Sequence, residues 1–354
     1  MKFKAITTLL LTISLLFSLV SCTASNPTDQ TTTTITQGYT QPEKTGVVAE
    51  GRSVFYNVDY TLYIPSSYKV NEDTPLLVAL HGGGQGTMDD AKDNRQFFAD
   101  YTGLNTAAEK YGFIVAYPRQ STANHAYGYD YWNWYMQYTE KDNEPRAIYN
   151  IVGEIKRAYS IDDERVFICG LSAGAAMAQI TAINFNSTFA GCCAVAGITF
   201  RSSTIYELND LQENGPTMDN EIIATRIYDS MGRGRKTAKL LVVTGSADTR
   251  VNPKNSLVMA QTWATAMKKI DSAVDTSLKQ EALIGIGGVE YTKTVHATLD
   301  GQELCTMYEV IGMEHNWPGS NKGISISITS GQDLGYKGGI DINEVMCEFF
   351  GLNK

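Results

Sequence analysis

Basic residues, histidines and cysteines are all sparse in this chain. Among 354 residues, 29 lysines and arginines are outnumbered by 38 acidic residues, which leaves a net charge of −9. With no basic block to neutralise phosphates, we expect no nucleic-acid partner. The six cysteines are too few to cross-link so long a chain and form no C-x-x-C pair. Neither a disulfide scaffold nor a zinc site is therefore predicted.

Hydrophobic runs of transmembrane length are also missing. The apolar run Leu9–Val20 follows two lysines and has 12 residues, fewer than the roughly 18 to 20 that span a bilayer. Residues 1–21 are therefore predicted to be an export signal. Its end, Leu19-Val20-Ser21-Cys22, resembles a bacterial lipobox, which implies cleavage before Cys22 and lipid attachment to its sulfur. The alternative is an ordinary secretion signal in which Cys22 has no role.

The segment after Cys22 is too polar to fold by itself. Residues 22–48 are mostly Thr, Ser, Gln, Asn and Pro and include the run Thr31–Thr34, so we predict a flexible tether. Residues 49–354 would then form one domain. The expected location is the outer face of a bacterial membrane, with the lipid at Cys22 as the only membrane contact, or the surrounding medium if Cys22 carries no lipid.

Short apolar runs alternate with helical stretches from Gly51 onward. The predicted strands cover residues 60–64, 76–80, 113–117, 165–169, 193–196, 240–244 and 304–311, and the predicted helices cover 97–111, 148–159 and 175–183. This alternation, expected to run to the end of the chain, is typical of an α/β protein: a mostly parallel sheet with helices on both faces. A hairpin turn is expected at Asp300-Gly301.

The clearest motif is Gly170-Leu171-Ser172-Ala173-Gly174, between a predicted strand and a predicted helix. A sharp strand-to-helix turn strains its central residue, so small residues must flank it. The motif predicts Ser172 as a nucleophile. It also directs the backbone N–H of Ala173 toward the negative charge that develops beside the serine.

A serine nucleophile needs an imidazole base within hydrogen-bond reach. His81 belongs to a glycine-rich turn, His125 to a tyrosine-rich loop and His296 to a predicted strand. His315 follows the last long strand in a loop shaped by glycine and proline, so we predict that His315 is the base. The alternative, an exposed loop histidine without a role, would leave Ser172 without a base.

Asp248 is predicted to orient that histidine. It follows the buried strand 240–244, and the chain order Ser172, Asp248, His315 is the order found in α/β-hydrolases. The alternative role for Asp248 is a helix N-cap. Glu314, next to the histidine, is expected to face elsewhere.

The segment His81-Gly82-Gly83-Gly84-Gln85 suits a second donor to the oxyanion. Glycine lets the backbone approach a substrate and turn an N–H inward. Gly83 is the first candidate and Gly82 the second. A phosphate-binding loop is not supported, because no lysine follows at the required spacing. We expect neither a metal ion nor an organic cofactor.

Aromatic residues are dense between Tyr127 and Tyr138. Core packing explains most of them, but flat side chains on an active-site loop also suit a sugar or a cinnamoyl ring. Trp132 and Trp134, together with Trp317 beside the predicted base, are the candidates for substrate contact.

The motifs together resemble those of a known family. They are Leu80-His81-Gly82, Gly103-Leu104-Asn105, Tyr111-Gly112-Phe113, Tyr117-Pro118, Trp132-Asn133-Trp134, Arg165 to Gly174, Ala247-Asp248, and Gly312 to Gly319. Over about residues 58–320 the chain resembles the secreted polyhydroxybutyrate depolymerase and feruloyl esterase family. The resemblance implies an α/β-hydrolase fold and a serine carboxylic-ester hydrolase with Ser172, Asp248 and His315 as its triad.

The resemblance implies more than one possible class of substrate. The expected reaction passes through an acyl-enzyme, with feruloyl or acetyl esters on plant cell-wall xylan as substrates; a polyhydroxybutyrate-type polyester is the alternative. An alternative of another class is a non-catalytic surface protein that binds glycans on a hydrolase scaffold, against which a complete triad argues. A serine peptidase would need a pocket for an amine leaving group. The acyl group and the oligomeric state are not fixed by the sequence.

The chain departs from the family in a few places. Many members carry one cysteine after His-Gly and another before Trp-Asn-Trp, where this chain has Gly83 and Tyr131. Both are missing together, as follows if they normally pair. Segments 201–239 and 270–289 match no motif and are candidates for a lid or rim. Cys305 and Cys347 are candidates for a disulfide in an exported protein.

Overall fold

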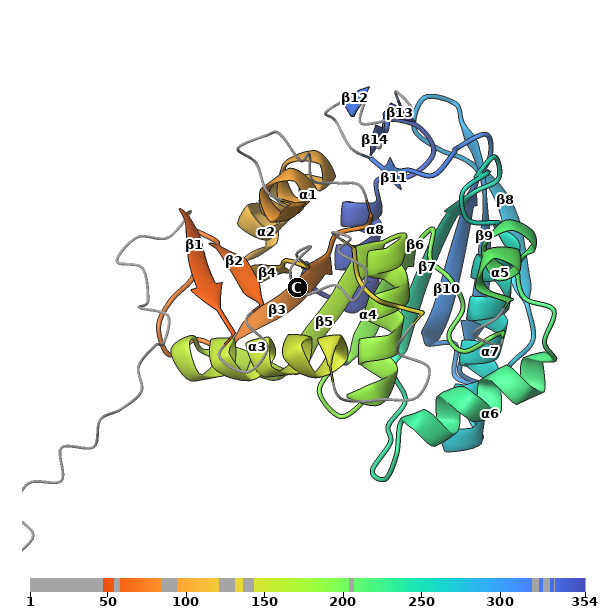
Figure 1. Cartoon of the computed structure of the whole chain (residues 1–354), viewed down its shortest axis with the longest axis horizontal. Helices are drawn as coiled ribbons and strands as arrows, with labels where there is room; N and C mark the ends of the chain where they lie inside the picture. Colours follow the sequence, from red (N-terminus) through yellow and green to blue (C-terminus); the bar gives the residue numbers. More distant parts are fainter. Residues whose placement is uncertain are drawn as a thin grey trace, which may run out of the picture. The chain divides into compact units, whose positions relative to one another are not determined.

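The structure is a computed structural model (Figure 1). It describes residues 47–53, 58–83, 94–120, 131–135, 143–203, 207–319, 325–326, 332–333 and 335–353. The predicted export signal, Cys22 and nearly all of the predicted tether lie outside this part of the chain, as does His125. No helix within the described residues has the length and apolar character needed to cross a membrane.

One ten-stranded sheet dominates the fold, in the order β1-β2-β4-β3-β5-β6-β7-β10-β9-β8. Its strands are β1 (Val47–Arg52), β2 (Asp59–Ile64), β3 (Thr74–Leu80), β4 (Ile114–Pro118), β5 (Ile161–Leu171), β6 (Gly191–Val195), β7 (Lys239–Gly245), β8 (Lys279–Ile284), β9 (Glu290–Ala297) and β10 (Glu303–Val310). The strands from β4 to β10 in this order are parallel. Two short pairs, β11 (Trp317–Pro318) with β14 (Gly335–Tyr336) and β12 (Ser325–Ile326) with β13 (Gln332–Asp333), lie outside the sheet.

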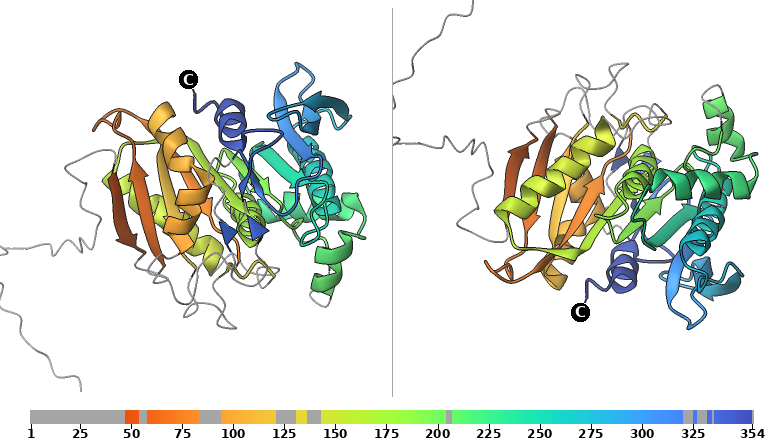
Figure 2. Two further views of the ribbon diagram at one scale, coloured as in Figure 1. Left: turned by 90° about the horizontal axis from the view of Figure 1, so that it is seen from above. Right: turned by 90° about the horizontal axis from the view of Figure 1, so that it is seen from below.

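Helices cover both faces of the sheet, as the sequence predicts (Figure 2). They are α1 (Asn94–Thr102), α2 (Leu104–Tyr111), α3 (Glu144–Ala158), α4 (Ala173–Asn184), α5 (Leu208–Asn214), α6 (Asn220–Ser230), α7 (Lys254–Ile270) and α8 (Ile342–Phe350). Buried residues of α3, α4, α6 and α7 form the core on one face, and those of α1, α2 and α8 form the core on the other. The central strands are apolar on both sides because both faces are covered.

The predicted helix over 97–111 is two helices. Gly103, between α1 and α2, has φ 72°, a left-handed conformation that ends one helix and starts the next. Periodicity alone misses this break, because Phe98, Leu104 and Ala108 all still pack into one core.

The predicted alternation of strand and helix fails after α7. There, β8, β9 and β10 follow one another as an antiparallel meander, with the expected turn at Asp300-Gly301 between β9 and β10. Segment 270–289 contains the edge strand β8, so it extends the sheet rather than forming a lid. Segment 201–239 contains α5 and α6, and α6 packs against α7 as part of the helical layer.

Cys305 and Cys347 do not pair. Both are free and buried, and they belong to different cores: Cys305 packs with α7 residues and Cys347 packs within α8 on the other face of the sheet. Burial raises the pKa of Cys347 to about 12, so its thiol is neutral at physiological pH and behaves as a small apolar group.

His296, on β9, is buried at 2% exposure. Burial is the main influence on its pKa and lowers it, against opposing contributions from the backbone of Thr276 and Ser277 and from the Asp275 charge. The folded state thus favours the neutral ring. As the pH falls below about 6.5, the unfolded chain takes up a proton that the folded chain does not, and the free energy of unfolding falls.

We predict that His296→Gln flattens this acid dependence. Urea unfolding between pH 7 and 5 should give a free energy of unfolding that declines less steeply for the variant than for the wild type. The comparison uses the slope, because the substitution also changes packing at every pH. Equal slopes for the variant and the wild type would show that His296 does not cause this acid dependence.

Candidate active site

Ser172 lies in the turn between β5 and α4, at the carboxyl edge of the parallel strands. Its backbone has φ 58° and ψ −121°, a conformation that costs a non-glycine residue roughly 1–3 kcal/mol. The Ser172 N–H donates to Val195 O at 2.9 Å, and the Ala176 N–H donates to Ser172 O at 3.1 Å. The strained turn expected from the motif is therefore present and is held by hydrogen bonds on both sides.

The glycines of the motif are required by close approach of backbone segments. A Cβ on Gly174 would lie 2.2 Å from Leu80 O and 2.4 Å from His81 O, and a Cβ on Gly170 would lie 2.4 Å from the Gly174 carbonyl. No side chain fits at such distances. The start of α4 is consequently packed directly against the end of β3, which brings Ser172 close to the glycine-rich turn.

Asp248 and His315 come from separate loops and are joined by a hydrogen bond. His315 Nδ1 lies 2.7 Å from Asp248 Oδ2, and both side chains are buried. Asp248 Oδ1 accepts from the backbone N–H groups of Arg250 and Val251 at 2.8 and 2.9 Å. These donors fix the carboxylate so that its second oxygen faces the imidazole. The N-cap position of α7 belongs to Pro253, so Asp248 is not its cap.

Hydrogen bonds hold together the two loops that carry Asp248 and His315. The Ala247 N–H donates to Met313 O at 3.0 Å, and the Gly312 N–H donates to Ser246 Oγ at 2.9 Å. A Cβ on Gly245 would lie 2.0 Å from Met313 O. The distance between Asp248 and His315 is therefore set by neighbouring parallel strands, β7 and β10, and not by the side chains alone. Glu314 is exposed, away from this contact.

Trp132 and Trp317, both predicted to contact substrate, lie in the interior of the domain. Both indoles are fully buried. Trp317 donates to Asn343 Oδ1 at 3.3 Å and packs edge-on against Phe98, with 5.7 Å between ring centroids. The Trp132 ring lies 5.5 Å from that of His81. Both indoles therefore pack against the residues around them, and the aromatic density of the sequence does not show this burial.

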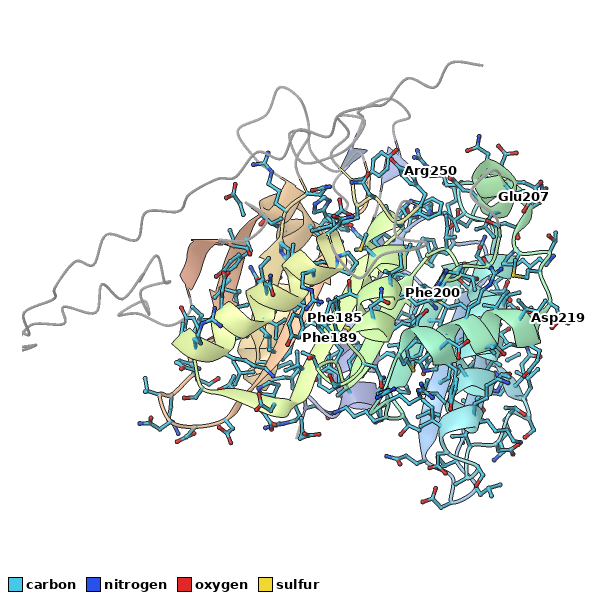
Figure 3. All side chains as sticks on the ribbon, turned by 60° about the horizontal axis from the view of Figure 1, so that its bottom comes forward. Phe185, Phe189, Phe200, Glu207, Asp219 and Arg250 are labelled. Carbon is cyan, nitrogen blue, oxygen red and sulfur yellow. The ribbon has the colours of Figure 1, made fainter. Side chains whose placement is uncertain are left out.

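Trp134 remains partly accessible and lines a small hollow beside α4. The hollow is bounded by Trp134, Ala176, Ile180, Ile198, Thr199, Phe200 and Arg201. It begins one helical turn after Ser172, and its wall continues into an apolar cluster with Leu211 of α5 and Val251. In Figure 3, Arg250 and Glu207 lie at the same end of the domain, while Phe200 lies deeper, between α4 and α6.

The two predicted oxyanion donors differ in setting. Ala173 is the first residue of α4, where backbone N–H groups have no partner within the helix. Gly82 is buried and Gly83 is exposed.

A Cβ on Gly83 would lie 3.3 Å from Tyr131 Cβ. The two positions where family members carry cysteines are thus neighbours here, close to the Cβ separation of about 3.5–4.5 Å of a disulfide.

A buried hydrogen-bond network lies behind the Gly82-Gly83 turn, and no motif in the sequence predicts it. Glu144, the first residue of α3, is 8% exposed and accepts hydrogen bonds from Gln120 and Asn133. The Gln120 N–H donates to His81 Nε2 at 3.0 Å. An acidic residue before a proline at a helix start is ordinarily solvated, so only the tertiary structure reveals this role.

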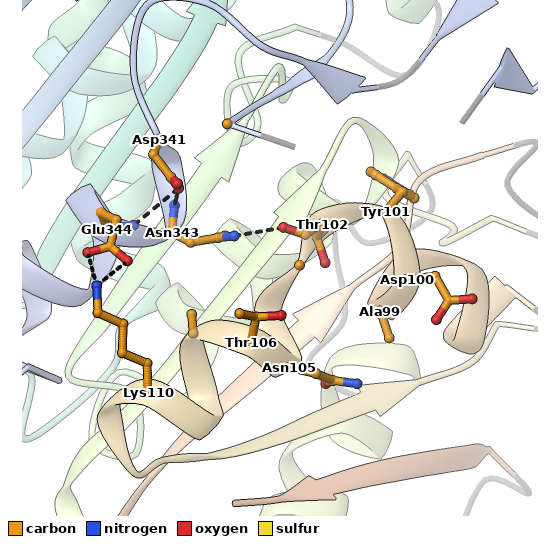
Figure 4. Close-up of a pocket in the computed structure, with 13 residues that line it drawn as sticks. Ala99, Asp100, Tyr101, Thr102, Asn105, Thr106, Lys110, Asp341, Asn343 and Glu344 are labelled. Atoms are coloured by element: carbon orange, nitrogen blue, oxygen red, sulfur yellow. Dashed lines mark hydrogen bonds and ion pairs between the residues drawn. The ribbon is translucent and has the colours of Figure 1, made fainter. Parts of the chain in front are cut away.

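A separate polar hollow of about 280 Å³ lies between α1, α2 and the start of α8 (Figure 4). Its walls include the ion pair between Lys110 and Glu344 and the hydrogen bond from Asn343 to Thr102 O. Ser172 is not among its lining residues. Across the described segments, no three His, Cys, Asp or Glu side chains are grouped so as to hold a metal ion.

The fold, with Ser172, Asp248 and His315 at the carboxyl edge of its parallel strands, is of the α/β-hydrolase type. The chain belongs to the esterase PHB depolymerase family, whose profile matches residues 58–273, more than half of its length.

Its relatives include the poly(3-hydroxyalkanoate) depolymerase C of Paucimonas lemoignei, 27% identical over 270 residues, and the acetylxylan esterase A of Aspergillus awamori, 26% identical over 274 residues. The first match covers 74% of this chain but only 59% of the relative, and the second covers 69% and 83%. The solved acetyl xylan esterase from Aspergillus awamori superposes with a TM-score of 0.63 at 20% identity, covering 87% of this chain and all of the other. That similarity supports the fold.

We predict that Gly83→Cys with Tyr131→Cys forms a disulfide. The bond would close a loop of 48 residues (131 − 83) and should raise the free energy of unfolding by about 2–4 kcal/mol under oxidising conditions. Thermal melting with and without a reductant measures the effect.

The single variant Gly83→Cys is the control and should melt alike in both conditions. Thiol titration of the oxidised double variant under denaturing conditions counts its free thiols. If both engineered thiols are free, the two positions are not neighbours.

Proposed function

We propose that this protein is a serine esterase in which Ser172 is the nucleophile, His315 the general base and Asp248 the group that orients the base. The observation that carries the proposal is the 2.7 Å hydrogen bond between His315 Nδ1 and Asp248 Oδ2, at the same sheet edge as the strained Ser172 turn. Membership of an esterase family supports it.

The chemistry follows from this arrangement. Because Nδ1 of His315 is bonded to Asp248, Nε2 is the ring nitrogen that takes the Ser172 proton as Oγ attacks the ester carbonyl. His315 then returns the proton to the departing alcohol, which leaves an acyl group on Ser172. Water deprotonated by the same base hydrolyses that acyl-enzyme and restores the serine.

The oxyanion of each tetrahedral intermediate would be stabilised by the backbone N–H groups of Ala173 and Gly83. Ala173 starts α4, and Gly83 lies in the turn after β3, against which α4 is packed. Preorganised donors of this kind are worth roughly 3–4 kcal/mol each in the transition state. No cofactor enters this mechanism.

Acetyl esters on xylan are the substrate class that we favour. Relatives with this printed activity match most of the chain. A polyester of hydroxyalkanoic acid is the second candidate, because the depolymerase match is nearly as long, 270 residues against 274.

We predict that Ser172→Ala removes turnover on acetylated xylan, methyl ferulate and poly(3-hydroxybutyrate) while leaving the fold unchanged. The variant lacks one oxygen atom, so its circular dichroism and melting temperature should match those of the wild type. Initial rates on the three substrates, measured side by side, should be highest on acetylated xylan.

Two results would count against these proposals. Wild-type rates retained by Ser172→Ala would refute the mechanism. Binding of xylan without turnover in both proteins would favour the alternative, a non-catalytic glycan-binding protein.

We also propose that the mature chain begins at Cys22 and is held at the outer face of a bacterial membrane by lipid. Support comes from the lipobox-like end of residues 1–21 and from the polar spacer 22–48. Cys22→Ser should move the protein from the membrane fraction to the soluble fraction at unchanged specific activity. A wild-type protein found in the medium with an unacylated N-terminus beyond Cys22 would refute the anchor.

A further inference from the structure

Glu144 is a buried acid that the proposed mechanism does not use. It starts α3, and its carboxylate accepts three hydrogen bonds: from the Gln120 side chain, from Asn133 N–H at 2.7 Å and from Asn133 Nδ2 at 2.7 Å. All three donors are neutral amides. Such a site is costly for a carboxylate, and burial raises the pKa of Glu144 to about 7.

One arm of this network reaches the turn that carries Gly83. The Gln120 N–H donates to His81 Nε2 at 3.0 Å, so the ring proton is on Nδ1, which donates to Gly82 O at 2.8 Å. Gly82 C=O and Gly83 N–H belong to the same planar peptide. Fixing the direction of the carbonyl therefore fixes the opposite direction of the N–H that is proposed to bind the oxyanion.

The other arm reaches the wall of the hollow beside α4. Asn133 lies between Trp132, whose ring packs against His81, and Trp134, which lines the hollow. The two Asn133 hydrogen bonds to Glu144 hold the backbone of this segment. One carboxylate thus fixes two parts of the site that are separated by 50 residues in sequence (133 − 83).

We propose that Glu144 is a positioning residue of the active site, which through Gln120 and His81 aims the Gly83 N–H at the oxyanion and through Asn133 holds Trp134 against the hollow. This inference rests on the proposed esterase function. A carboxylate suits the role because it accepts from every donor, whereas an amide at the same place would turn a donor toward Asn133 or Gln120.

The test compares Glu144→Gln with Glu154→Gln. Glu154 lies on the same helix and accepts from the hydroxyls of Ser53 and Tyr60, both at 3.3 Å, outside the network. For 4-nitrophenyl acetate, Glu144→Gln should lower the acylation rate constant by about 10- to 100-fold, less than the loss of a whole oxyanion donor, with KM within about twofold. Glu154→Gln should leave both unchanged.

An oxyanion mimic separates positioning from general destabilisation. The inhibition constant of a trifluoromethyl ketone, whose adduct places an oxyanion at this site, should rise in Glu144→Gln by the same factor as the rate falls. A lowered melting temperature with unchanged rate and inhibition constant would overturn the proposal, as would a lowered rate with unchanged inhibition.

His81→Phe provides a second variant should Glu144→Gln fold poorly. It keeps a ring against Trp132 but removes the bond to Gly82 O. It should lower the rate by the part of the loss that passes through the Gly82-Gly83 peptide, and the double variant should lose no more than Glu144→Gln alone, because His81 acts only through that peptide. Multiplying losses would contradict the shared route.

One readout does not depend on turnover. Amide hydrogen exchange in the peptide that contains Gly82 and Gly83 should be faster in Glu144→Gln than in the wild type and unchanged in Glu154→Gln. Unchanged exchange would overturn the positioning role. A wild type that hydrolyses no ester would instead refute the proposed function, and exchange would still test the positioning.

Discussion

The contact between the start of α4 and the end of β3 is the constraint on which the rest of the site depends. Gly174 faces the carbonyls of Leu80 and His81 at distances that leave no room for a Cβ. This packing brings the strained Ser172 turn and the Gly82-Gly83 turn, which are distant in sequence, to one place at the sheet edge. A nucleophile and two backbone donors can then be fixed by main-chain geometry, which costs little reorganisation when charge develops.

Two buried carboxylates lie at or behind the proposed site, Asp248 and Glu144, and they differ in their hydrogen-bond partners. Asp248 accepts from two backbone N–H groups on one oxygen and faces His315 with the other. This arrangement holds the Asp248 carboxylate in one orientation against the imidazole of His315. Glu144 has only amide partners and a pKa raised by burial. Its hydrogen bonds lead through Gln120 and His81 to the backbone of the Gly82-Gly83 turn, whereas Asp248 bonds to the imidazole of His315.

The sequence predicted most of the central sheet because its buried strands are short apolar runs, and the motif Gly170 to Gly174 has a steric reason for its residues at the end of one of them. It also predicted that Asp248 and His315 would each follow a strand; the structure shows that these strands, β7 and β10, are neighbours. The hairpin of β9 and β10 was predicted from the turn at Asp300-Gly301. The break at Gly103 and the edge strand β8 were missed, since periodicity does not report a single left-handed residue and the mostly exposed residues of β8 form no buried apolar run. The burial of Trp132 and of Glu144 was not visible in the sequence, because burial of an aromatic or acidic side chain is a property of the assembled fold.

The central claim is that Ser172, activated by His315, forms a covalent intermediate. Peptide mapping by mass spectrometry after reaction with a fluorophosphonate tests this directly. We predict modification of Ser172 alone in the wild type, at a rate that falls by orders of magnitude in His315→Ala, whose serine has lost its base. Modification at a different residue, or equally fast modification of Ser172 without His315, would contradict the account.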